Sequence, residues 1–288
     1  MRAAERLREA LASPGIIVMP CCFDGLSAKL IADAGTKVSF MSGFAASAAR
    51  LGLPDTGLIS FGEMVDSVRN CCAAAPDMPI IADGDTGYGN ALNVQRTVTE
   101  YARAGAAGVM IEDQVSPKKC GHTKGKQVIS REEARLKIRA AVEAARKADI
   151  LVLARTDARA THGLDEALAR CQDFVAEGAD MIFLEAPETV DEMRRFCAAI
   201  PRPCMANMVF GGKTPVLPPD ELAKIGFKLA AYPLVVLSAA VSAMQQAIAA
   251  LQPSANIPEP PQVSFEELKK VVGFPDYYAR EERYLAAE

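Results

Sequence analysis

Residues 104–113 read AGAAGVMIED, and this short stretch carries the pattern that decides the fold. Gly105 is suited to end a helix in the left-handed conformation, and the apolar run after it is suited to a buried parallel strand. The acids Glu112 and Asp113 close the run. Comparable junctions of helix, glycine and strand occur at Ala34-Gly35, Glu177-Gly178 and Ile225-Gly226. Their recurrence predicts a repeated β/α unit.

Eight apolar runs of strand length alternate with stretches of helical periodicity. The runs are Gly15–Pro20, Lys37–Ser42, Pro79–Asp83, Gly108–Asp113, Ile150–Arg155, Met181–Glu185, Pro203–Asn207 and Lys228–Pro233. Helical periodicity is clear at Asn93–Ala104, Arg131–Ala145 and Leu164–Glu177. Eight such units favour an α/β fold of the (β/α)8 TIM barrel type over an open doubly wound sheet. We assign residues 1–252 to this barrel and expect a helix at Ala3–Ala12 to cover its bottom.

Residues 253–288 follow the eight units and are expected to form a Pro-rich connector and a C-terminal helical arm. Ser264 is suited to cap a helix over Phe265–Val272, and Pro275 to begin a last helix. A terminal arm that leaves a completed barrel is expected to pack on a neighbouring subunit.

The stretch from Leu229 to Pro258 contains no charged residue. A membrane span is one explanation of such a composition. The early Pro233 and the pair Gln245-Gln246 favour another, a helix buried in a subunit interface. We therefore expect an oligomer and no membrane partner.

The bulk composition narrows the functional class. Half of the 288 residues are apolar, and the net charge is −4. The negative charge argues against a nucleic-acid partner, because binding nucleic acid needs a concentrated basic face. Two pairs among the eight cysteines are adjacent in sequence, Cys21-Cys22 and Cys71-Cys72, and no secretory signal opens the chain. This usage predicts reduced thiols and a cytoplasmic location.

In a TIM barrel the active site lies at the C-terminal ends of the strands. Polar residues end at least five of the predicted strands, and they are Ser42, Asp83, Asp85, Glu112, Asp113, Arg155, Asp157, Glu185 and Asn207. Asp83, Asp85 and Glu112 are candidate Mg²⁺ ligands, because Mg²⁺ prefers oxygen and needs few carboxylates beside water and substrate. Alternatively, Asp83 or Asp85 braces a turn, and Asp113 is a structural ion-pair partner.

Arg155 is suited to bind a substrate carboxylate through its planar guanidinium. The alternative is an arginine of the barrel wall paired with an acid such as Glu185, and both can hold together. Asn207 can donate to a substrate oxygen or cap the loop after its strand. Ser42 and the Gly43 amide can bind a carboxylate or form a simple turn.

The run Lys118-Lys119-Cys120-Gly121-His122 sets a thiol among basic groups, which favours thiolate and suggests a proton donor to an enolate. The alternatives without a catalytic role are an inert cysteine and a solvated basic loop. His122 would orient the substrate or only the loop. Residues 114–128 are polar and Gly-bearing, so they are also suited to close over a substrate.

Together these segments resemble the isocitrate lyase and phosphoenolpyruvate mutase superfamily over nearly the whole chain. The matching motifs are Asp83-Gly84-Asp85-Thr86-Gly87-Tyr88-Gly89, Glu112-Asp113-Gln114 and Lys118-Lys119-Cys120-Gly121-His122. The resemblance implies a (β/α)8 barrel that depends on Mg²⁺, or Mn²⁺ in its place, and acts on a small dicarboxylate. It also implies a homotetramer built from two dimers that swap a C-terminal helix.

The resemblance also implies roles for individual residues. Asp83, Asp85 and Glu112 would hold Mg²⁺ directly or through water, with help from Asp55. The substrate would contact Ser42, Gly43, Phe44, Gly121, Arg155, Glu185, Asn207 and Pro233. The catalytic candidates are Cys120, Glu112, Arg155 and His122, with Cys120 exchanging a proton with the carbanion carbon.

Four features separate the branches of this superfamily, and one of them, the stretch 207–215, is similar to the alkylmalate lyases of the 2,3-dimethylmalate lyase and petal death protein type. Cys120 favours lyases over phosphonate-forming mutases, which lack this cysteine. Phe44 replaces the second glycine of the Ser-Gly-Gly usual in isocitrate and methylisocitrate lyases, and residues 207–215 are also unlike those of methylisocitrate lyases. Pro233 stands where oxaloacetate hydrolases tend to have serine.

The resulting hypothesis is a Mg²⁺-dependent carbon–carbon lyase that cleaves a 2,3-dialkylmalate-type 2-hydroxy diacid into a 2-oxo acid and a carboxylic acid. Cys120 would protonate the enolate that departs. A 2-methylisocitrate lyase is the nearest alternative. Others are an oxaloacetate hydrolase, a phosphonomutase and a non-catalytic barrel that binds a metabolite.

Overall fold

The computed structural model describes residues 1–121, 125–252 and 262–285. His122 and the stretch 253–261, which holds most of the predicted connector, lie outside the described residues. By its internal contacts the chain divides into two compact units, Met1–Val236 and Leu237–Glu288.

The first unit is built on eight parallel strands that close into a barrel in chain order, with β1 paired to both β2 and β8. The strands are β1 (Ile17–Cys22), β2 (Ser39–Met41), β3 (Ile80–Asp83), β4 (Gly108–Glu112), β5 (Leu151–Thr156), β6 (Met181–Leu184), β7 (Cys204–Asn207) and β8 (Leu229–Tyr232). Their ends differ from the expected runs by at most two residues. The predicted (β/α)8 TIM barrel is confirmed.

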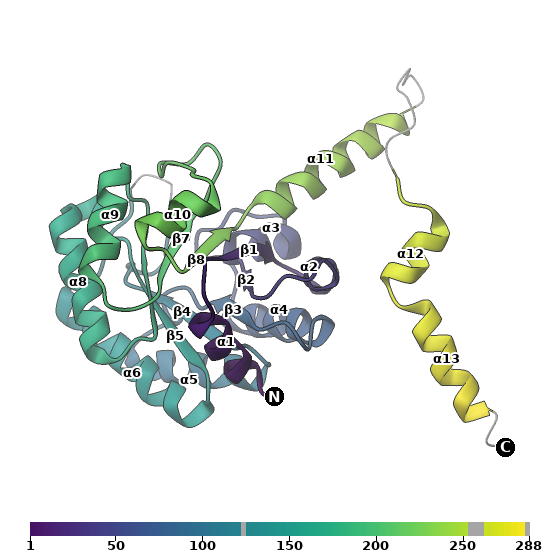
Figure 1. Cartoon of the computed structure of the whole chain (residues 1–288), viewed down its shortest axis with the longest axis horizontal. Coiled ribbons are helices and arrows are strands. Elements are labelled where there is room, and N and C mark those ends of the chain that lie inside the picture. The colour runs from purple at the N-terminus through teal and green to yellow at the C-terminus, as the bar shows by residue number, and fades with distance from the viewer. Residues whose placement is uncertain (122–124, 253–261, 286–288) are drawn as a thin grey trace. The chain divides into compact units, whose positions relative to one another are not determined.

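Helices surround the strands, as Figure 1 shows for α5, α6 and α8 outside β4 and β5. The helices of this unit are α1 (Ala3–Ala12), α2 (Gly25–Asp33), α3 (Gly43–Leu51), α4 (Phe61–Ala74), α5 (Ala91–Arg103), α6 (Arg131–Ala148), α7 (Arg159–His162), α8 (Leu164–Glu177), α9 (Val190–Ala199) and α10 (Pro219–Ile225). Helix α3 starts directly after β2, so its N-terminus lies at the carboxyl ends of the strands.

All four glycines predicted to end helices have positive φ angles, from +79° at Gly35 to +116° at Gly226. Residues with a Cβ rarely adopt this conformation, so glycine turns the chain from helix toward strand at these points. The repeated junction therefore identified the β/α units correctly.

Two hydrophobic layers hold the barrel together. The outer layer lies between the strands and the helices, and a separate inner cluster fills the barrel itself. Leu7 of α1 is fully buried in the inner cluster with Met19, Ile81 and Met110. The N-terminal helix thus covers one end of the barrel, as expected, and leaves the carboxyl ends of the strands for a site.

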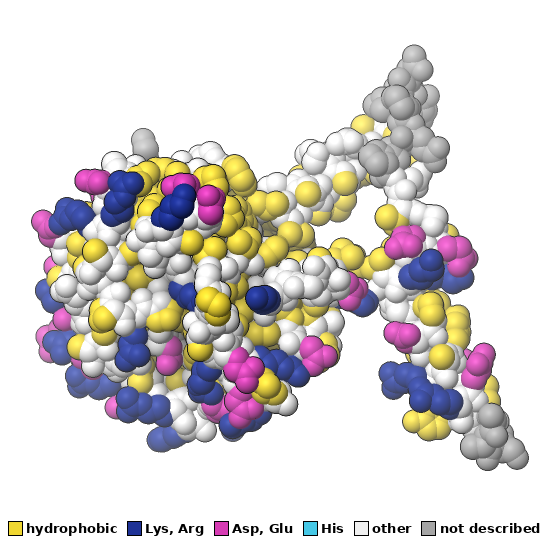
Figure 2. Space-filling view, in the orientation of Figure 1, with side chains coloured by type: hydrophobic (Ala, Val, Ile, Leu, Met, Phe, Trp, Pro, Cys, Tyr) yellow, Lys and Arg dark blue, Asp and Glu magenta, His cyan; other side chains and the backbone are white. Residues whose placement is uncertain are grey.

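The second unit contains most of α11 (Val235–Ala250), with α12 (Phe265–Val271) and α13 (Phe274–Leu285). Ser264 accepts a hydrogen bond from the Glu267 N–H at 3.1 Å, which confirms the predicted cap. Helix α11 buries none of its residues within the described chain and, as Figure 2 shows, presents apolar and uncharged polar side chains. Within the described ranges, no helix is long and apolar enough to cross a lipid bilayer.

Candidate active site

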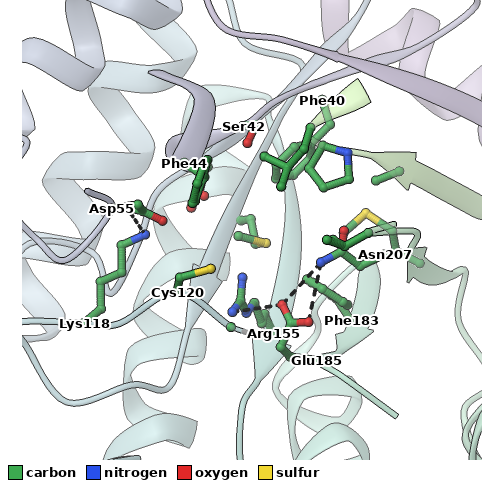
Figure 3. Close-up of a pocket in the computed structure, with 18 of the residues that line it drawn as sticks. Phe40, Ser42, Phe44, Asp55, Lys118, Cys120, Arg155, Phe183, Glu185 and Asn207 are labelled. Carbon is green, nitrogen blue, oxygen red and sulfur yellow. Dashed lines mark hydrogen bonds and ion pairs between the residues drawn. The ribbon is translucent and has the colours of Figure 1, made fainter. Parts of the chain in front are cut away.

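The predicted site residues gather around one cavity of about 130 Å³ (Figure 3). Those that line it are Ser42, Phe44, Asp55, Asp83, Cys120, Gly121, Arg155, Glu185, Asn207 and Pro233. Three others, Gly43, Asp85 and Glu112, contact residues of this lining. The position of His122 is outside the part of the chain that is described.

Asp83, the last residue of β3, is held by two backbone amides. The Gly43 N–H donates to its Oδ2 at 3.2 Å and the Asp85 N–H to its Oδ1 at 3.0 Å. A Cβ at Gly43 would lie only 2.5 Å from Asp83 Oδ2, so this position needs glycine. Ser42 caps α3 by accepting from the Ala45 N–H, which places the start of that helix against the carboxylate.

A buried lysine joins two of the acids. Lys118 Nζ lies 2.5 Å from Asp55 Oδ1 and 2.9 Å from Asp85 Oδ1. Burial lowers the pKa of the Lys118 ammonium, but Asp85, Asp83 and nearby acids outweigh it and raise that pKa well above its usual value. Lys118 is therefore not part of a solvated basic loop, which was one alternative for this segment.

The acids are crowded as well as buried. Burial and the charge of Asp85 raise the pKa of Asp83 to about 6. Burial also raises the pKa of Asp55, and it raises that of Glu112 well above its usual value. A cation placed among these carboxylates would lower their pKa values again, because it favours their charged forms.

The donor set fits a hard divalent cation bound through few direct ligands. Asp83, Asp85 and Glu112 supply oxygen, and the buried Glu112 Oε1 accepts no hydrogen bond. Among the described residues, no group of three acidic, histidine or cysteine side chains is close enough to hold one ion. Mg²⁺ commonly binds to one or two carboxylates and keeps several waters, so this arrangement suits it.

Arg155, from β5, joins three acids beneath the cavity. Its Nε lies 3.2 Å from Glu112 Oε2 and 2.9 Å from Asp157 Oδ2, and its Nη2 lies 2.9 Å from Glu185 Oε2. The guanidinium also stacks 5.2 Å from the ring centre of Phe183. Burial lowers the pKa of Arg155, but the acids raise it further, so the group stays charged. The pairing with Glu185 that was one alternative is present, and the arginine still lines the cavity.

Glu185 and Asn207 lie on the side of the site away from Lys118 and Asp55 (Figure 3). Asn207 Nδ2 donates to the two Glu185 carboxylate oxygens at 3.4 and 3.5 Å. Gly121 passes close to this side, since a Cβ there would lie 2.5 Å from Glu185 Oε2 and 2.6 Å from Arg155 Nη2. No larger residue fits at 121 without moving Arg155 or Glu185.

Asp113 takes the structural role that was its alternative. Its carboxylate accepts from Thr156 Oγ1 at 2.6 Å, from the Asp157 N–H at 2.9 Å and from Arg170 Nη1 at 3.0 Å. These contacts fix the end of β5, so Asp113 supports the segment that carries Arg155 rather than facing the cavity.

Cys120 lies between the Lys118–Asp55 pair and Arg155, with its sulfur directed into the cavity (Figure 3). Gln114 braces the preceding residue: its side chain accepts from the Lys119 N–H at 3.0 Å and donates to the Lys119 carbonyl at 2.9 Å. An antiparallel bridge between Gln114 and Val128 closes the base of the segment 114–128.

Two contributions were missed from the sequence. The sequence places the charge of Lys118 near the Cys120 thiol, but it does not predict that Lys118 pairs with Asp55 and Asp85. The sequence pattern does not single out Lys126, whose buried ammonium contacts Asp157 and Gly121. The only sequence feature that points to either lysine is its place in the polar segment 114–128, which also carries Cys120.

Apart from Lys118 and Lys119, the remaining wall of the cavity is apolar. Beside Phe44 and Pro233 it is formed by Phe40, Met110, Phe183, Met205, Val209, Ala231 and Leu234. Charged groups on one side and an apolar wall on the other suit an acid that carries hydrocarbon substituents.

The chain is similar to known proteins over most of its length. The family model described as phosphoenolpyruvate phosphomutase matches residues 7–252. The chain is 45% identical to 2,3-dimethylmalate lyase from Eubacterium barkeri, over 85% of this chain and 84% of that one. It is 42% identical to the petal death protein of Dianthus caryophyllus (94% and 86% covered). It is also 42% identical to the chloroplastic carboxyvinyl-carboxyphosphonate phosphorylmutase of Arabidopsis thaliana (98% and 85% covered).

Solved structures are similar over almost the whole chain. Oxaloacetate acetylhydrolase in complex with 3,3-difluorooxalacetate has a TM-score of 0.93 at 33% identity, with 98% of this chain and 97% of that chain covered. Phosphonopyruvate hydrolase in complex with oxalate and Mg²⁺ has a TM-score of 0.83 at 30% identity, with 99% and 100% covered. On this fold and these similarities, the chain belongs to the phosphoenolpyruvate mutase and isocitrate lyase superfamily.

Proposed function

We propose that the protein is a Mg²⁺-dependent carbon–carbon lyase that cleaves a 2-hydroxy dicarboxylic acid of the 2,3-dialkylmalate type. The products would be a 2-oxo acid and a carboxylic acid, which for 2,3-dimethylmalate are pyruvate and propionate. The observation that carries the proposal is that Cys120, Arg155 and Asp83 line one cavity together with an apolar wall. A proton donor, an anion-binding group and a metal-binding acid are thus available to one small substrate.

The metal would be held by Asp83, Asp85 and Glu112, one or two of them directly and the rest through water, with Asp55 assisting. When bound, Mg²⁺ would supply Lewis-acid chemistry: it would favour loss of the substrate hydroxyl proton and stabilise a 2-oxo acid. One of these carboxylates, or a water beside them, would accept that proton as the C2=O bond forms. Lys118 offsets the charge of Asp55 and Asp85, to which it is paired.

The remaining steps belong to the chain's own side chains. Arg155 and Asn207 would bind the substrate carboxylates, and the Ser42, Gly43 and Gly121 segments would complete that binding. When the C2–C3 bond breaks, its electron pair passes to C3, and charge develops on the carboxylate of the departing fragment. Arg155 is fixed beforehand by its acidic partners, so it can stabilise that charge without reorganising. Cys120 then gives its proton to C3, and solvent restores the thiol.

The apolar wall supports an alkylated substrate over one with a third carboxylate. Phe44 lines the cavity in the place where the motif of isocitrate and methylisocitrate lyases has glycine, and Pro233 lines it where oxaloacetate hydrolases tend to have serine. A 2-methylisocitrate lyase remains the nearest alternative, since it uses the same bond cleavage on a substrate with one more carboxylate. The high structural similarity to oxaloacetate acetylhydrolase keeps oxaloacetate hydrolysis as a second candidate.

A panel of substrates tests the proposal. Purified protein with Mg²⁺ is incubated separately with 2,3-dimethylmalate, 2-methylisocitrate and oxaloacetate, and release of 2-oxo acid or oxalate is measured with and without EDTA. EDTA-sensitive release of pyruvate from dimethylmalate in preference to the others supports the proposal. Preference for methylisocitrate or oxaloacetate supports the corresponding alternative. In a separate incubation with phosphoenolpyruvate, phosphonate formation would indicate a mutase. No turnover of any of these substrates would favour a non-catalytic barrel that binds a metabolite.

We also propose a homotetramer in which α11 packs on another copy of the chain. Val241, Met244 and Ile248 of this uncharged helix are 40–61% exposed, which is unfavourable in water for an apolar surface. Sedimentation velocity on the full chain checks this proposal, and a monomer at micromolar concentration would contradict it.

A further inference from the structure

Lys126 is a buried lysine in the segment 114–128 with two well-defined acceptors. Its Nζ lies 2.7 Å from Asp157 Oδ1 and donates to the Gly121 carbonyl at 2.5 Å. The side chains of Lys126 and Asp157 are 1% and 0% exposed. A buried ammonium is costly unless it is paired and hydrogen-bonded, so both acceptors are needed to keep it there.

Asp157 connects this lysine to the anion-binding arginine. Its Oδ2 accepts from Arg155 Nε at 2.9 Å and its Oδ1 from Arg155 Nη2 at 3.1 Å. The backbone N–H of Asp157 donates to Asp113, which is itself paired with Arg170. Lys126 is therefore fastened to a rigid part of the barrel, the same part that fixes Arg155.

Gly121 connects the lysine to the proton donor. Its backbone passes so close to Arg155 and Glu185 that no Cβ fits, and its carbonyl is held from the other side by Lys126. Cys120 precedes Gly121 directly and lines the cavity. A shift of the Gly121 peptide would therefore move the Cys120 thiol relative to Arg155 and the bound substrate.

We propose that Lys126 is a positioning residue for proton transfer. Its hydrogen bond to the Gly121 carbonyl sets where the Cys120 thiol lies, and its ion pair with Asp157 fixes that position relative to Arg155. The inference rests on the proposed function in assigning proton transfer to Cys120. The positioning itself is independent of the substrate and can be measured without one.

The test compares Lys126→Met with Lys147→Met, a matched control at an exposed lysine of α6. Alkylation of Cys120 in the full-length, substrate-free protein by iodoacetamide is followed by peptide mass spectrometry. We expect Lys126→Met to raise the Cys120 alkylation rate at least about fivefold, because the anchor of the segment is lost. Lys147→Met should leave that rate within about twofold of the unaltered protein.

A second variant separates position from charge and decides the question if Lys126→Met does not fold. Lys126→Arg keeps the charge, but its larger head group must displace the Gly121 carbonyl that now lies 2.5 Å from Nζ. It should therefore also accelerate alkylation of Cys120. An unchanged or slower alkylation rate in a folded Lys126 variant overturns the proposal.

Kinetics on the substrate found by the panel provide a further readout. Lys126→Met should lower kcat by about 10²-fold, the loss that a misplacement of roughly 1 Å can cause, while KM changes little because Arg155 keeps its acidic partners. A rise in KM with unchanged kcat would contradict the positioning role. Faster alkylation in a protein that turns over no diacid would leave the positioning in place and remove the proposed function.

Discussion

Gly43 lies directly against Asp83: its N–H donates to Asp83 Oδ2 at 3.2 Å, and a Cβ at Gly43 would lie 2.5 Å from the same oxygen. The start of α3 and the end of β3 are thus matched to each other without room for a side chain. Position 43 shapes the proposed metal site although glycine supplies no ligand atom.

Gly43→Ala should weaken Mg²⁺ binding at least about tenfold, because the new methyl group must push the Asp83 carboxylate out of place. Gly62→Ala is the matched control, since a Cβ at Gly62 in α4 meets nothing within 4 Å. Isothermal titration of Mg²⁺ into both variants measures the effect. Equal Mg²⁺ affinities would contradict the assignment of Asp83 to the metal.

Cys120→Ser should lower turnover by about 10²–10⁴-fold while the fold is kept, because a positioned proton donor is replaced by a far weaker acid. Cys72→Ser provides the control, since Cys72 lies on α4, away from the cavity, and burial raises its pKa to about 12. Initial rates and circular dichroism of both variants are compared. Near-normal turnover by Cys120→Ser would remove this residue from the mechanism.

Arg155→Met should lower the free energy of unfolding by about 3–5 kcal/mol, in addition to abolishing activity, because Glu112, Asp157 and Glu185 lose a buried partner. Arg139→Met removes an exposed arginine paired with Glu177 and should have a far smaller effect. Urea denaturation of both variants provides the comparison. Similar losses at the two positions would mean that the acids under the cavity do not depend on Arg155.

Phe44→Gly should shift substrate preference toward 2-methylisocitrate, because it removes an aromatic side chain from the cavity wall. The quantity to measure is the ratio of kcat/KM for methylisocitrate to that for dimethylmalate. We expect this ratio to rise at least about tenfold, within the range that a change of pocket volume can produce. A ratio that stays constant would show that Phe44 does not select the substrate.

The fold was predictable because its signals are local. The strand runs and the glycines at 35, 105, 178 and 226 each act within a few residues, and the left-handed φ angles confirm their role. The strand ends also predicted which side chains converge, because the carboxyl ends of parallel barrel strands meet at one rim.

The electrostatic pairing within the site was less predictable because it joins residues far apart in sequence. Arg170 is 57 residues from Asp113, and this contact gives Asp113 its structural role. Lys126 is 31 residues from Asp157, and nothing in the local pattern shows that a lysine in a polar loop is buried. Only the folded barrel brings these charges together.

The most direct test of the lyase proposal is the reaction of 2,3-dimethylmalate in D2O with Mg²⁺, followed by NMR. We expect pyruvate and propionate in equal amounts, with one deuterium at carbon 2 of propionate, because the exchangeable Cys120 proton is transferred to that carbon. EDTA should stop the formation of both products. Absence of propionate from an enzyme that is active on another substrate of the panel would contradict the account.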